Sequence, residues 1–440
     1  MRRPLVVAAL AVAAAALFLA VPRRPAVRLL PAGVIELHAA LAVDADNELR
    51  GAPSGTVLHL APDFAGRAAV VVCGDNVTLR DFVIDGNRAA LETRAGLPPS
   101  NVPFARFTRA NGVLAEGVSG LRIDGLRCRN IAGFAVLVSR ARSVDIRRVS
   151  VADSGSRNSL GRNNSTGGIL LEEGTADFRV THCDLVRVRG NGIWTHSLYT
   201  SPRNARGLVA FNRFLEIGRD AIQAGHATAL SVFANSGARI GFPVDEVDIE
   251  NGAVSAALDT AGNVDASSYA GNRFREIDGK CIDLDGFHDG EVRANQCVNR
   301  APAAAYRYGH YGITMNNSNP DMRPQNIRLV DNLIDGTLFG GIFVIGSGHT
   351  IARNRLLHLD ASHCNENAAR YGCYYAPADP EILEAGIYLA RGAALPAPAR
   401  NNLIDNNLIT GFKMQSRCII AAPGVDARSN TIVDNICRDR

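Results

Sequence analysis

The feature that most constrains this chain is a short phrase that recurs along most of its length. The phrase is an extended stretch, then Asn-x-apolar, then, a few residues later, glycine followed by isoleucine or valine and a further apolar position. Several intervals between copies are 22 or 23 residues, and longer intervals are expected where loops are inserted into the same unit. The clearest copies begin at Asn212, Asn272, Asn295, Asn332, Asn354, Asn406 and Asn435.

These units predict stacked coils of parallel β-strand. Apolar and polar residues alternate within each unit, as in Val144-Asp145-Ile146, and glycine or asparagine separates the strands. A period of two is typical of strands, and no window after the N-terminal segment carries a helical period. A unit of this size cannot bury an apolar face alone, so neighbouring units must stack to form a continuous core. The recurring asparagines would then hydrogen bond to one another, amide to amide, at one turn of the stack.

The composition is that of a folded protein with a sizeable core. Of the 440 residues, 47% are hydrophobic and 20% are charged, which excludes a disordered or acidic-tail protein. The 47 basic residues nearly balance the 43 acidic ones. A net charge of +4 gives no reason to expect a nucleic acid or an anionic membrane surface as a partner. Lysine occurs only at Lys280 and Lys413.

The first 24 residues have the pattern of an export segment. Arg2 and Arg3 precede an uninterrupted apolar run of 17 residues from Leu5 to Val21. Because this run is also at the short limit for a membrane span, residues 1–24 are either a cleaved signal peptide or a retained N-terminal anchor. Only an uncleaved segment would bring the chain to a membrane. We therefore expect a secreted, periplasmic or cell-surface protein.

The chain has nine cysteines, and an exported chain can form disulfides. Cys364 and Cys373 lie nine residues apart in a loop-like segment and are the best candidates for such a bond. No Cys-x-x-Cys pair and no Cys/His spacing typical of zinc occurs in the sequence. The cysteines inside apolar strand patterns are expected to be small buried hydrophobic side chains: Cys128, Cys183, Cys281, Cys297 and Cys418.

With its asparagine phrases and alternating strands, the chain resembles right-handed parallel β-helix proteins of the pectin-lyase type. The resemblance covers roughly residues 67–437. It implies an all-β fold, a single-stranded right-handed parallel β-helix (solenoid) with long inserted loops. We expect this domain to span residues 67–440, and residues 25–66 to form a lead-in that caps the open N-terminal coil. Members of this superfamily are mostly extracellular enzymes that act on acidic or neutral polysaccharides.

The chain departs from the motifs of individual families within that superfamily. Of the polygalacturonase pattern, only Gly-His pairs such as Gly225-His226 are present, and they lack the second glycine. The Trp-Ile-Asp-His signature of pectate lyases is missing as well. The resemblance therefore implies a fold and a polysaccharide ligand, and it selects no family.

Alignment of the units on their glycine-, alanine- or cysteine-isoleucine pairs predicts which side chains point outward. The isoleucines should face the core, so the residue after each points away from it. The inward set is Ile193, Ile222, Ile282, Ile313, Ile342 and Ile387, and the outward set is Trp194, Gln223, Asp283, Thr314, Phe343 and Tyr388. Polar and titratable residues concentrate in four coils that contain residues 189–196, 219–226, 280–289 and 310–317. We expect a glycan-binding groove across these coils.

Three chemistries fit the charged residues of these coils. Asp283 and Asp285 lie on one face of one strand, about 7 Å apart by strand geometry, and such a pair can act as general acid and base on a glycosidic bond. Lys280 or Arg219 can instead abstract a proton beside a uronate carboxylate in a β-elimination. Asp220 should lie near Lys280, one coil away if the segment between them adds no coil, and is the partner of Lys280 as base or neutralising charge.

The third chemistry is binding of Ca²⁺ by Asp283, Asp285 and Asp289, because calcium prefers hard oxygen ligands. No other cofactor is expected, and no metal site is assigned. His226 and His288 are further acid/base candidates. The candidates for substrate binding are Trp194 as a platform that stacks on a sugar ring, and His196, Gln223, Arg219, Tyr311 and Asn316.

Long insertions are expected at 88–110, 152–167, 197–206, 227–268, 301–310 and 360–384. Loops of this length in a regular solenoid are usually functional or disordered. The longest, 227–268, joins the two coils that are richest in polar residues. Its segment 257–263 would cover the groove or form an irregular coil.

The leading hypothesis is an exported polysaccharide-active enzyme, a hydrolase or a lyase or epimerase, that binds a polysaccharide or oligosaccharide over the central coils. The alternatives are a non-catalytic carbohydrate-binding or surface-adhesion solenoid, and an enzyme relative whose site has decayed. The concentration of titratable residues in neighbouring coils favours the enzyme.

Overall fold

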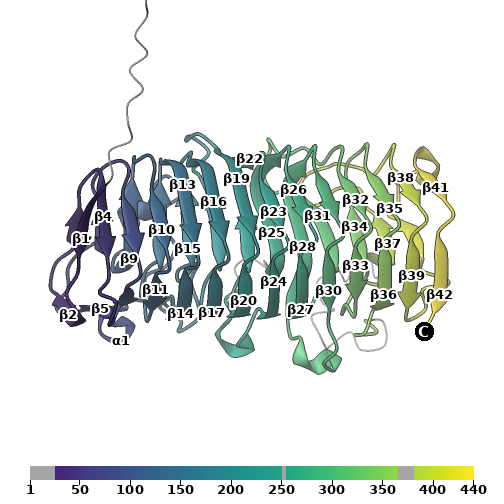
Figure 1. The fold of residues 1–440 in the computed structure, drawn as a ribbon. Helices are drawn as coiled ribbons and strands as arrows, with labels where there is room; N and C mark the ends of the chain where they lie inside the picture. The colour runs from purple at the N-terminus through teal and green to yellow at the C-terminus, as the bar shows by residue number, and fades with distance from the viewer. Residues whose placement is uncertain (1–24, 250–253, 365–380) are drawn as a thin grey trace, which may run out of the picture.

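The computed structural model describes residues 25–249, 254–364 and 381–440. The predicted export segment and Cys373 lie outside these residues. The described chain forms a rod of stacked coils, and Figure 1 shows the sequence running steadily from one end of the rod to the other. The secondary structure is almost entirely strand, paired in parallel. Among the described residues, no helix has the length and apolar character needed to cross a membrane.

Each coil contributes strands to three faces of the rod, and each strand pairs with its equivalent one coil away. The first face, which carries the candidate site, consists of β3 (Leu41–Val43), β6 (Ala68–Val72), β9 (Asn111–Glu116), β12 (Val136–Ser139), β15 (Ile169–Glu172), β18 (Ile193–His196), β21 (Ile222–Ala224), β25 (Ser255–Asp265), β28 (Gly279–His288), β31 (Ile313–Asn316), β34 (Ile342–Val344), β37 (Ile387–Leu389) and β40 (Ile419–Ala421).

The second face consists of β1 (Ala26–Leu29), β4 (Asn47–Arg50), β7 (Thr78–Arg80), β10 (Arg122–Asp124), β13 (Arg142–Arg147), β16 (Ala176–Thr181), β19 (Asn204–Ala210), β22 (Ala227–Thr228), β23 (Ser231–Phe233), β26 (Ser268–Ala270), β29 (Glu291–Arg293), β32 (Arg328–Val330), β35 (Thr350–Ala352), β38 (Leu403–Asp405) and β41 (Thr431–Val433). The long strands β25 and β28 bend from the first face towards the second, where β25 also pairs with β22.

The third face is a 14-stranded parallel sheet. Its strands are β2 (Gly33–Leu37), β5 (Thr56–Leu60), β8 (Val83–Asp85), β11 (Arg127–Arg129), β14 (Ser150–Ser154), β17 (Asp184–Val188), β20 (Arg213–Ile217), β24 (Ser236–Ile240), β27 (Arg273–Ile277), β30 (Gln296–Val298), β33 (Leu333–Asp335), β36 (Arg355–Leu359), β39 (Leu408–Gly411) and β42 (Ile436–Asp439).

Short helices occur only in the connections between the described strands. They are α1 (Arg88–Leu91), α2 (Phe104–Phe107), η1 (Val244–Glu246), η3 (Ala303–Ala305), α3 (Glu381–Glu384) and η5 (Ala427–Ser429). Of these, α2 matters for the site because it lies against the first face and packs on β12.

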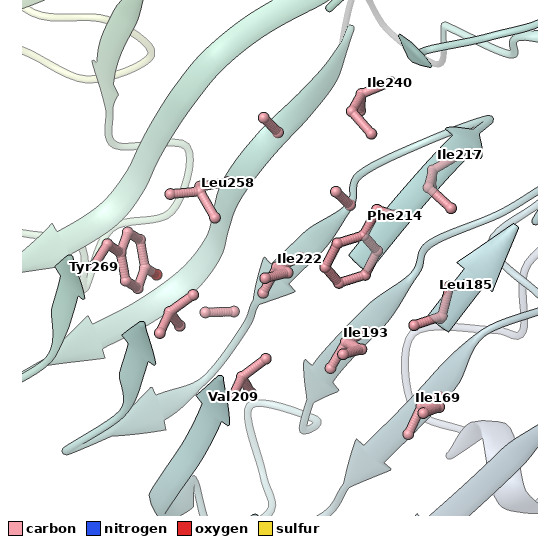
Figure 2. Packing of buried hydrophobic residues seen from close by; sticks show 14 of the residues in the cluster. Ile169, Leu185, Ile193, Val209, Phe214, Ile217, Ile222, Ile240, Leu258 and Tyr269 are labelled. Carbon is pink, nitrogen blue, oxygen red and sulfur yellow. The ribbon is translucent and has the colours of Figure 1, made fainter. Parts of the chain in front are cut away.

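The core is a set of aliphatic rows that run along the rod inside the three faces. On the first face, Ile193 is the register partner of Ile222, and Ile222 of Leu258. Figure 2 shows Ile169, Ile193, Ile222 and Leu258 following one another through the interior. All six isoleucines that were predicted to face inward are buried, so that prediction is confirmed. Rows of β-branched side chains of this kind suit strands buried against a core.

The predicted asparagine ladder is present at the turn between the second and third faces. Each amide group donates to the side-chain oxygen of the next asparagine along the rod, over distances between 2.8 and 3.1 Å. The members are Asn212, Asn235, Asn272, Asn295, Asn332, Asn354, Asn407 and Asn435. The copy of the phrase that was placed at Asn406 therefore begins one residue later. Because all of these asparagines except Asn435 are buried, the ladder satisfies polar groups that would otherwise have no partner.

Two predicted boundaries differ from the structure. Residues 25–66, expected as a lead-in, already form coils of the solenoid, because β1 pairs with β4 and β2 with β5. The segment 227–268, expected as one long insertion, contains β22, β23, β24 and β25, and so adds a coil. Its Ala-Leu pair at Ala257-Leu258 takes the place of the Ala-Ile pair used for the alignment, which is why this coil was not recognised.

The cysteines pair more extensively than predicted. Cys281 is bonded to Cys297, with Cα atoms 5.9 Å apart, and Cys418 is bonded to Cys437, with Cα atoms 5.7 Å apart. The prediction that Cys281, Cys297 and Cys418 are unpaired hydrophobic side chains is therefore wrong. Both members of each pair lie in the same coil on neighbouring faces, a proximity that alternation along one strand does not reveal. Cys364 is also disulfide-bonded. Cys128 and Cys183 are buried without a disulfide, as predicted.

Two adjacent asparagines provide a matched test of the ladder. Asn407 is buried and exchanges hydrogen bonds with Asn354, Asn435 and the Ile351 carbonyl. The substitution Asn407→Ala leaves these groups without partners, so we expect the free energy of unfolding to fall by about 2–4 kcal/mol. Urea denaturation measures the loss.

The control is Asn406→Gly, because the Asn406 side chain is exposed and glycine accepts its positive φ of 53°. We expect this change to alter stability by less than about 1 kcal/mol. Equal losses in the two variants would contradict the role assigned to the ladder.

Candidate active site

The outward side chains of the first face form one row along the rod, which we call the outer row. Its members are successive register partners: Trp194, Gln223, Asp259, Asp283, Thr314, Phe343 and Tyr388. The order is the predicted one, with Asp259 added by the extra coil. Only the part from Gln223 to Thr314 is polar. The register is firmly set, because a slip of one residue would exchange these polar side chains with the buried aliphatic row.

Asp259 lies at the end of a chain of amide hydrogen bonds. Asn191 Nδ2 donates to Gln223 Oε1 over 2.7 Å, and Gln223 Nε2 donates to Asp259 Oδ2 over 2.6 Å. Burial raises the pKa of Asp259 well above its usual value, and the nearby carboxyl groups of Asp220 and Asp283 raise it further. The environment of Asp259 therefore favours the neutral, protonated acid.

Asp283 has the opposite kind of environment. Lys280 Nζ donates to Asp283 Oδ2 over 2.5 Å, and Thr314 Oγ1 donates to Asp283 Oδ1 over 2.6 Å. A group that accepts hydrogen bonds at both oxygens, one of them from an ammonium group, has the contacts of a carboxylate. Burial lowers the pKa of Lys280, but the pairing with Asp283 outweighs it, so the net pKa of Lys280 is raised. Lys280 is therefore a charged partner of Asp283.

Asp220 lies two coils from Lys280, because β25 runs between β21 and β28. The intervening position is Ala256, whose backbone N–H donates to Asp220 Oδ1 over 2.7 Å. Burial raises the pKa of Asp220 to about 6, although the charge of Arg219 opposes the shift. The sequence placed Asp220 one coil from Lys280 only if the segment between them added no coil, and β25 adds one; the charges of the two residues still influence each other. We refer to Asp220, Asp259, Asp283 and Lys280 as the carboxylate cluster.

Asp285 holds a loop at the edge of this cluster. Its oxygens accept hydrogen bonds from Ser318 N over 2.9 Å and from Ser318 Oγ over 2.6 Å. Burial raises the pKa of Asp285. Asp285 therefore fixes the connection that follows β31, and its catalytic role stays a prediction. The register partner of Asp283 on the neighbouring strand is Asp259, which the sequence did not single out as a site residue.

Trp194 points outward as predicted, but it is not available as a stacking platform. Its side chain is only 8% exposed, and Phe104 of α2 packs on it with ring centroids 4.9 Å apart. The insertion that carries α2 folds over this end of the outer row, which the spacing of strand residues did not reveal. An aromatic side chain that sequence reasoning missed, Tyr199, is 55% exposed. Partial burial, and then the charges of Asp321 and Asp285, raise the pKa of its hydroxyl group to about 12.

The histidine candidates do not join the carboxylate cluster. His288, at the C-terminal end of β28, is hydrogen-bonded to Asn263 and to Asp289, each over 2.7 Å. His196 and His226 lie beside Glu172 and Glu173, towards the N-terminal end of the outer row. Burial, together with the charge of His226, lowers the pKa of His196 to about 4.

Three further candidates for substrate binding, Tyr311, Asn316 and Arg219, lie in different surroundings. The Tyr311 ring is buried and its hydroxyl donates to the Ile382 carbonyl. The Asn316 side chain accepts a hydrogen bond from Asn317 N over 2.8 Å. Arg219 lies next to Asp220, and its positive charge opposes the rise in the pKa of Asp220. Their roles in binding remain predictions.

The predicted calcium ligands are not assembled. Asp289 is hydrogen-bonded to His288 and Asn326 and not to Asp283. One oxygen of Asp283 already accepts a hydrogen bond from the ammonium group of Lys280. Among the residues that the structure describes, ligand atoms of three histidine, cysteine or acidic side chains converge only at Glu172, Glu173 and His196.

Comparisons with known proteins agree with this architecture. No protein-family model and no curated protein matches the chain. Among solved structures, the chain is similar to DFA-IIIase from Arthrobacter chlorophenolicus A6 in complex with GF2, with 13% identity and a TM-score of 0.52 over 93% of this chain and 88% of that one. It is also similar to the Dettilon tailspike protein (gp208), with 14% identity and a TM-score of 0.53 over 92% of this chain and 63% of that one.

Both neighbours are right-handed parallel β-helix proteins. At these identities the likeness establishes the fold and nothing finer. The predicted fold is thereby confirmed: the chain is a right-handed parallel β-helix.

The raised pKa of Asp220 predicts a stability that falls as the pH rises. An unfolded aspartate titrates near pH 3.9, whereas folded Asp220 titrates at about 6. The folded state holds the proton more tightly, so Asp220 destabilises the fold progressively as the pH rises from about 4 to about 6. In Asp220→Asn this loss is absent, and we expect the decline in unfolding free energy between pH 4 and pH 7 to shrink by about 1–3 kcal/mol.

Urea denaturation at several pH values measures this difference. The control is Asp245→Asn, because the Asp245 side chain is 97% exposed, and its profile should follow that of the unsubstituted protein. Parallel profiles for Asp220→Asn and the unsubstituted protein would show that Asp220 is not buried as described.

Proposed function

We propose that this protein is an exported enzyme that cleaves or transfers a glycosidic bond of a polysaccharide or oligosaccharide at the carboxylate cluster. The observation that carries the proposal is the pairing of Asp259 with Asp283 on neighbouring strands in opposite environments. The surroundings of Asp259 favour the protonated acid, whereas Asp283 has the hydrogen-bond partners of a carboxylate. Pairs whose surroundings drive their protonation states apart are the usual sign of an acid and a base or nucleophile.

In the proposed reaction, Asp259 gives its proton to the oxygen of the leaving sugar. As the bond to the leaving sugar breaks, Asp283 attacks the anomeric carbon as nucleophile, or stabilises its developing positive charge. Water or the hydroxyl group of an acceptor sugar then attacks that carbon, displaces Asp283 if it is bonded there, and gives a proton back to Asp259. Lys280 and Thr314 orient Asp283 through their hydrogen bonds. Paired positions on neighbouring strands are about 4.8 Å apart, which is closer to the carboxyl separation of retaining enzymes, about 5–5.5 Å, than to the longer one of inverting enzymes.

The same contacts argue against a lyase that uses Lys280 as its base. A lysine acts as a base when its pKa is lowered towards neutral pH, and the pairing with Asp283 has the opposite effect on Lys280. Epimerisation by proton abstraction at Lys280 is disfavoured for the same reason. We therefore place hydrolysis or transfer before β-elimination.

Binding of the glycan is proposed along the outer row. Phe343, which follows Thr314 in the row, is partly exposed and stacks on Tyr388 with an interplanar angle of 14°. Tyr199 stands at the other side of the polar segment, near Asp285. Aromatic faces on either side of a set of acids suit sugar rings on both sides of the scissile bond. The export segment proposed for residues 1–24 and the disulfides fit an oxidising compartment.

Product analysis tests the proposal. The purified protein is incubated with a panel of neutral and acidic polysaccharides and oligosaccharides, and the panel includes the DFA-III and GF2 that are bound in the DFA-IIIase structures. We expect new reducing ends or transferred sugars with no ultraviolet-absorbing unsaturated ends. Unsaturated products would select a lyase, and retention of a glycan with no product would select a binding protein.

With an active substrate in hand, Asp259→Asn and Asp283→Asn should each lower kcat by about 10²–10⁴-fold, because each removes a group that acts on the reacting bond. Circular dichroism should show an unchanged fold. The control is Asp145→Asn on β13, on a different face of the rod, which should retain activity. Normal turnover in either cluster variant would contradict the assignment.

The pH profile provides a further readout of the same pair. Because burial raises the pKa of Asp259, activity should persist above the pH at which an ordinary aspartate loses its proton. The decline on the alkaline side should follow deprotonation of Asp259.

A further inference from the structure

A second group of titratable side chains lies on the first face, outside the carboxylate cluster. One potential ligand atom from each of Glu172, Glu173 and His196 lies within 4.8 Å of the other two. Glu172 ends β15 and is the register partner of His196 on β18. Glu173 follows at once with a φ of 58°, a left-handed turn conformation. The strand pairing and this turn together bring three side chains with metal-binding chemistry to one point.

The two carboxyl groups are buried, and no lysine or arginine among the described residues forms an ion pair with them. Glu172 is 0% exposed and Glu173 is 4% exposed. Glu172 accepts hydrogen bonds from the backbone N–H groups of Phe104 and Ala105. Glu173 accepts from Leu198 N and Ser201 Oγ. These donors are uncharged, and two adjacent buried acids without a cation are expensive to hold in a folded protein.

An independent observation concerns the histidines. His196 Nδ1 and His226 Nε2 are both buried and have no hydrogen-bond partner. His226 is only 7% exposed, and it lies near enough to Glu173 and His196 for charge interactions with both. Buried polar atoms without partners are rare in native proteins, and an unplaced ion is one of the recognised explanations.

We propose that Glu172, Glu173 and His196 bind a divalent transition-metal ion such as Zn²⁺ next to His226. Two carboxylate oxygens and one imidazole nitrogen are ligands that Zn²⁺ accepts, with water in the fourth position of a tetrahedral site. The ion supplies a positive charge beside the two glutamates and gives the His196 imidazole a partner. This site is distinct from the carboxylate cluster and does not depend on the proposed activity.

The bound ion has a structural consequence at the end of the outer row. Glu172 accepts a hydrogen bond from the first residue of α2, and Glu173 accepts one from Leu198 in the connection 198–201. An ion shared by both glutamates therefore ties two insertions to the first face, next to Trp194 on one side and Tyr199 on the other. We expect metal binding to raise the unfolding temperature, because it stabilises the folded state by mass action.

The test is metal binding by the untagged full chain after treatment with a chelator. Zn²⁺, Co²⁺ and Ca²⁺ are titrated separately by calorimetry. We expect one equivalent of Zn²⁺ or Co²⁺ per chain, a higher unfolding temperature, and at least tenfold weaker binding of Ca²⁺, because calcium requires an all-oxygen site. Tighter binding of Ca²⁺ than of Zn²⁺, or no stoichiometric binding of either transition metal, would overturn the proposal.

Substitutions locate the site. Glu173→Gln and His196→Gln should each weaken Zn²⁺ binding at least tenfold. Asp283→Asn in the carboxylate cluster, and His182→Gln on the surface beside Phe211, should leave it within twofold of the unsubstituted protein. Unchanged affinity in both ligand variants would place the ion elsewhere.

X-ray absorption at the zinc edge of the unsubstituted protein covers the case in which a ligand variant fails to fold. The expected spectrum contains imidazole and carboxylate scattering. A spectrum without imidazole would also overturn the proposal.

Discussion

The structure depends on one constraint: successive coils stack in register, with each asparagine of the ladder bonded to its equivalent in the next coil. Inside the rod the aliphatic rows satisfy the same register, since a shifted strand would lose both its apolar contacts and its amide partners. Most irregularity lies in the connections, where α2 and the other short helices are found, although the β25–β28 and β36–β39 pairs each contain one register shift. The faces between them therefore remain regular enough to bring distant residues into fixed contact.

The carboxylate cluster is a direct product of that stacking. Gln223 and Asp259 are 36 residues apart in sequence and Asp283 and Thr314 are 31 apart, yet each pair shares a hydrogen bond. The four positions from Gln223 to Thr314 follow one another along a single row. Partial burial between neighbouring strands then separates the behaviour of the acids. Asp259 lies among other carboxyl groups, whereas Asp283 has the ammonium group of Lys280.

The repeat in the sequence was sufficient to predict the fold, the asparagine ladder and the inward isoleucines, because each follows from local periodicity. It was also sufficient to place Asp283 and Gln223 in one outward row. It failed where the pattern changed in a single residue, since the Ala257-Leu258 pair concealed a coil and with it Asp259. It failed again where the connections decide the outcome. The burial of Trp194 under Phe104 depends on how an insertion folds back. The Cys281–Cys297 bond depends on where two faces of the rod meet. Neither arrangement leaves a periodic pattern in the sequence.

The account depends most on Asp259 and Asp283 being buried neighbours, and titration of the Asp259 carboxyl carbon by NMR in selectively labelled protein tests this most directly. The expected midpoint of Asp259 lies well above the usual value for aspartate of about 4. In Asp283→Asn the midpoint should fall, because the repelling charge of Asp283 is lost and Lys280 becomes free to pair with Asp259. An ordinary midpoint that is unaffected by the substitution would contradict the stacking of these two strands and the active site built on it.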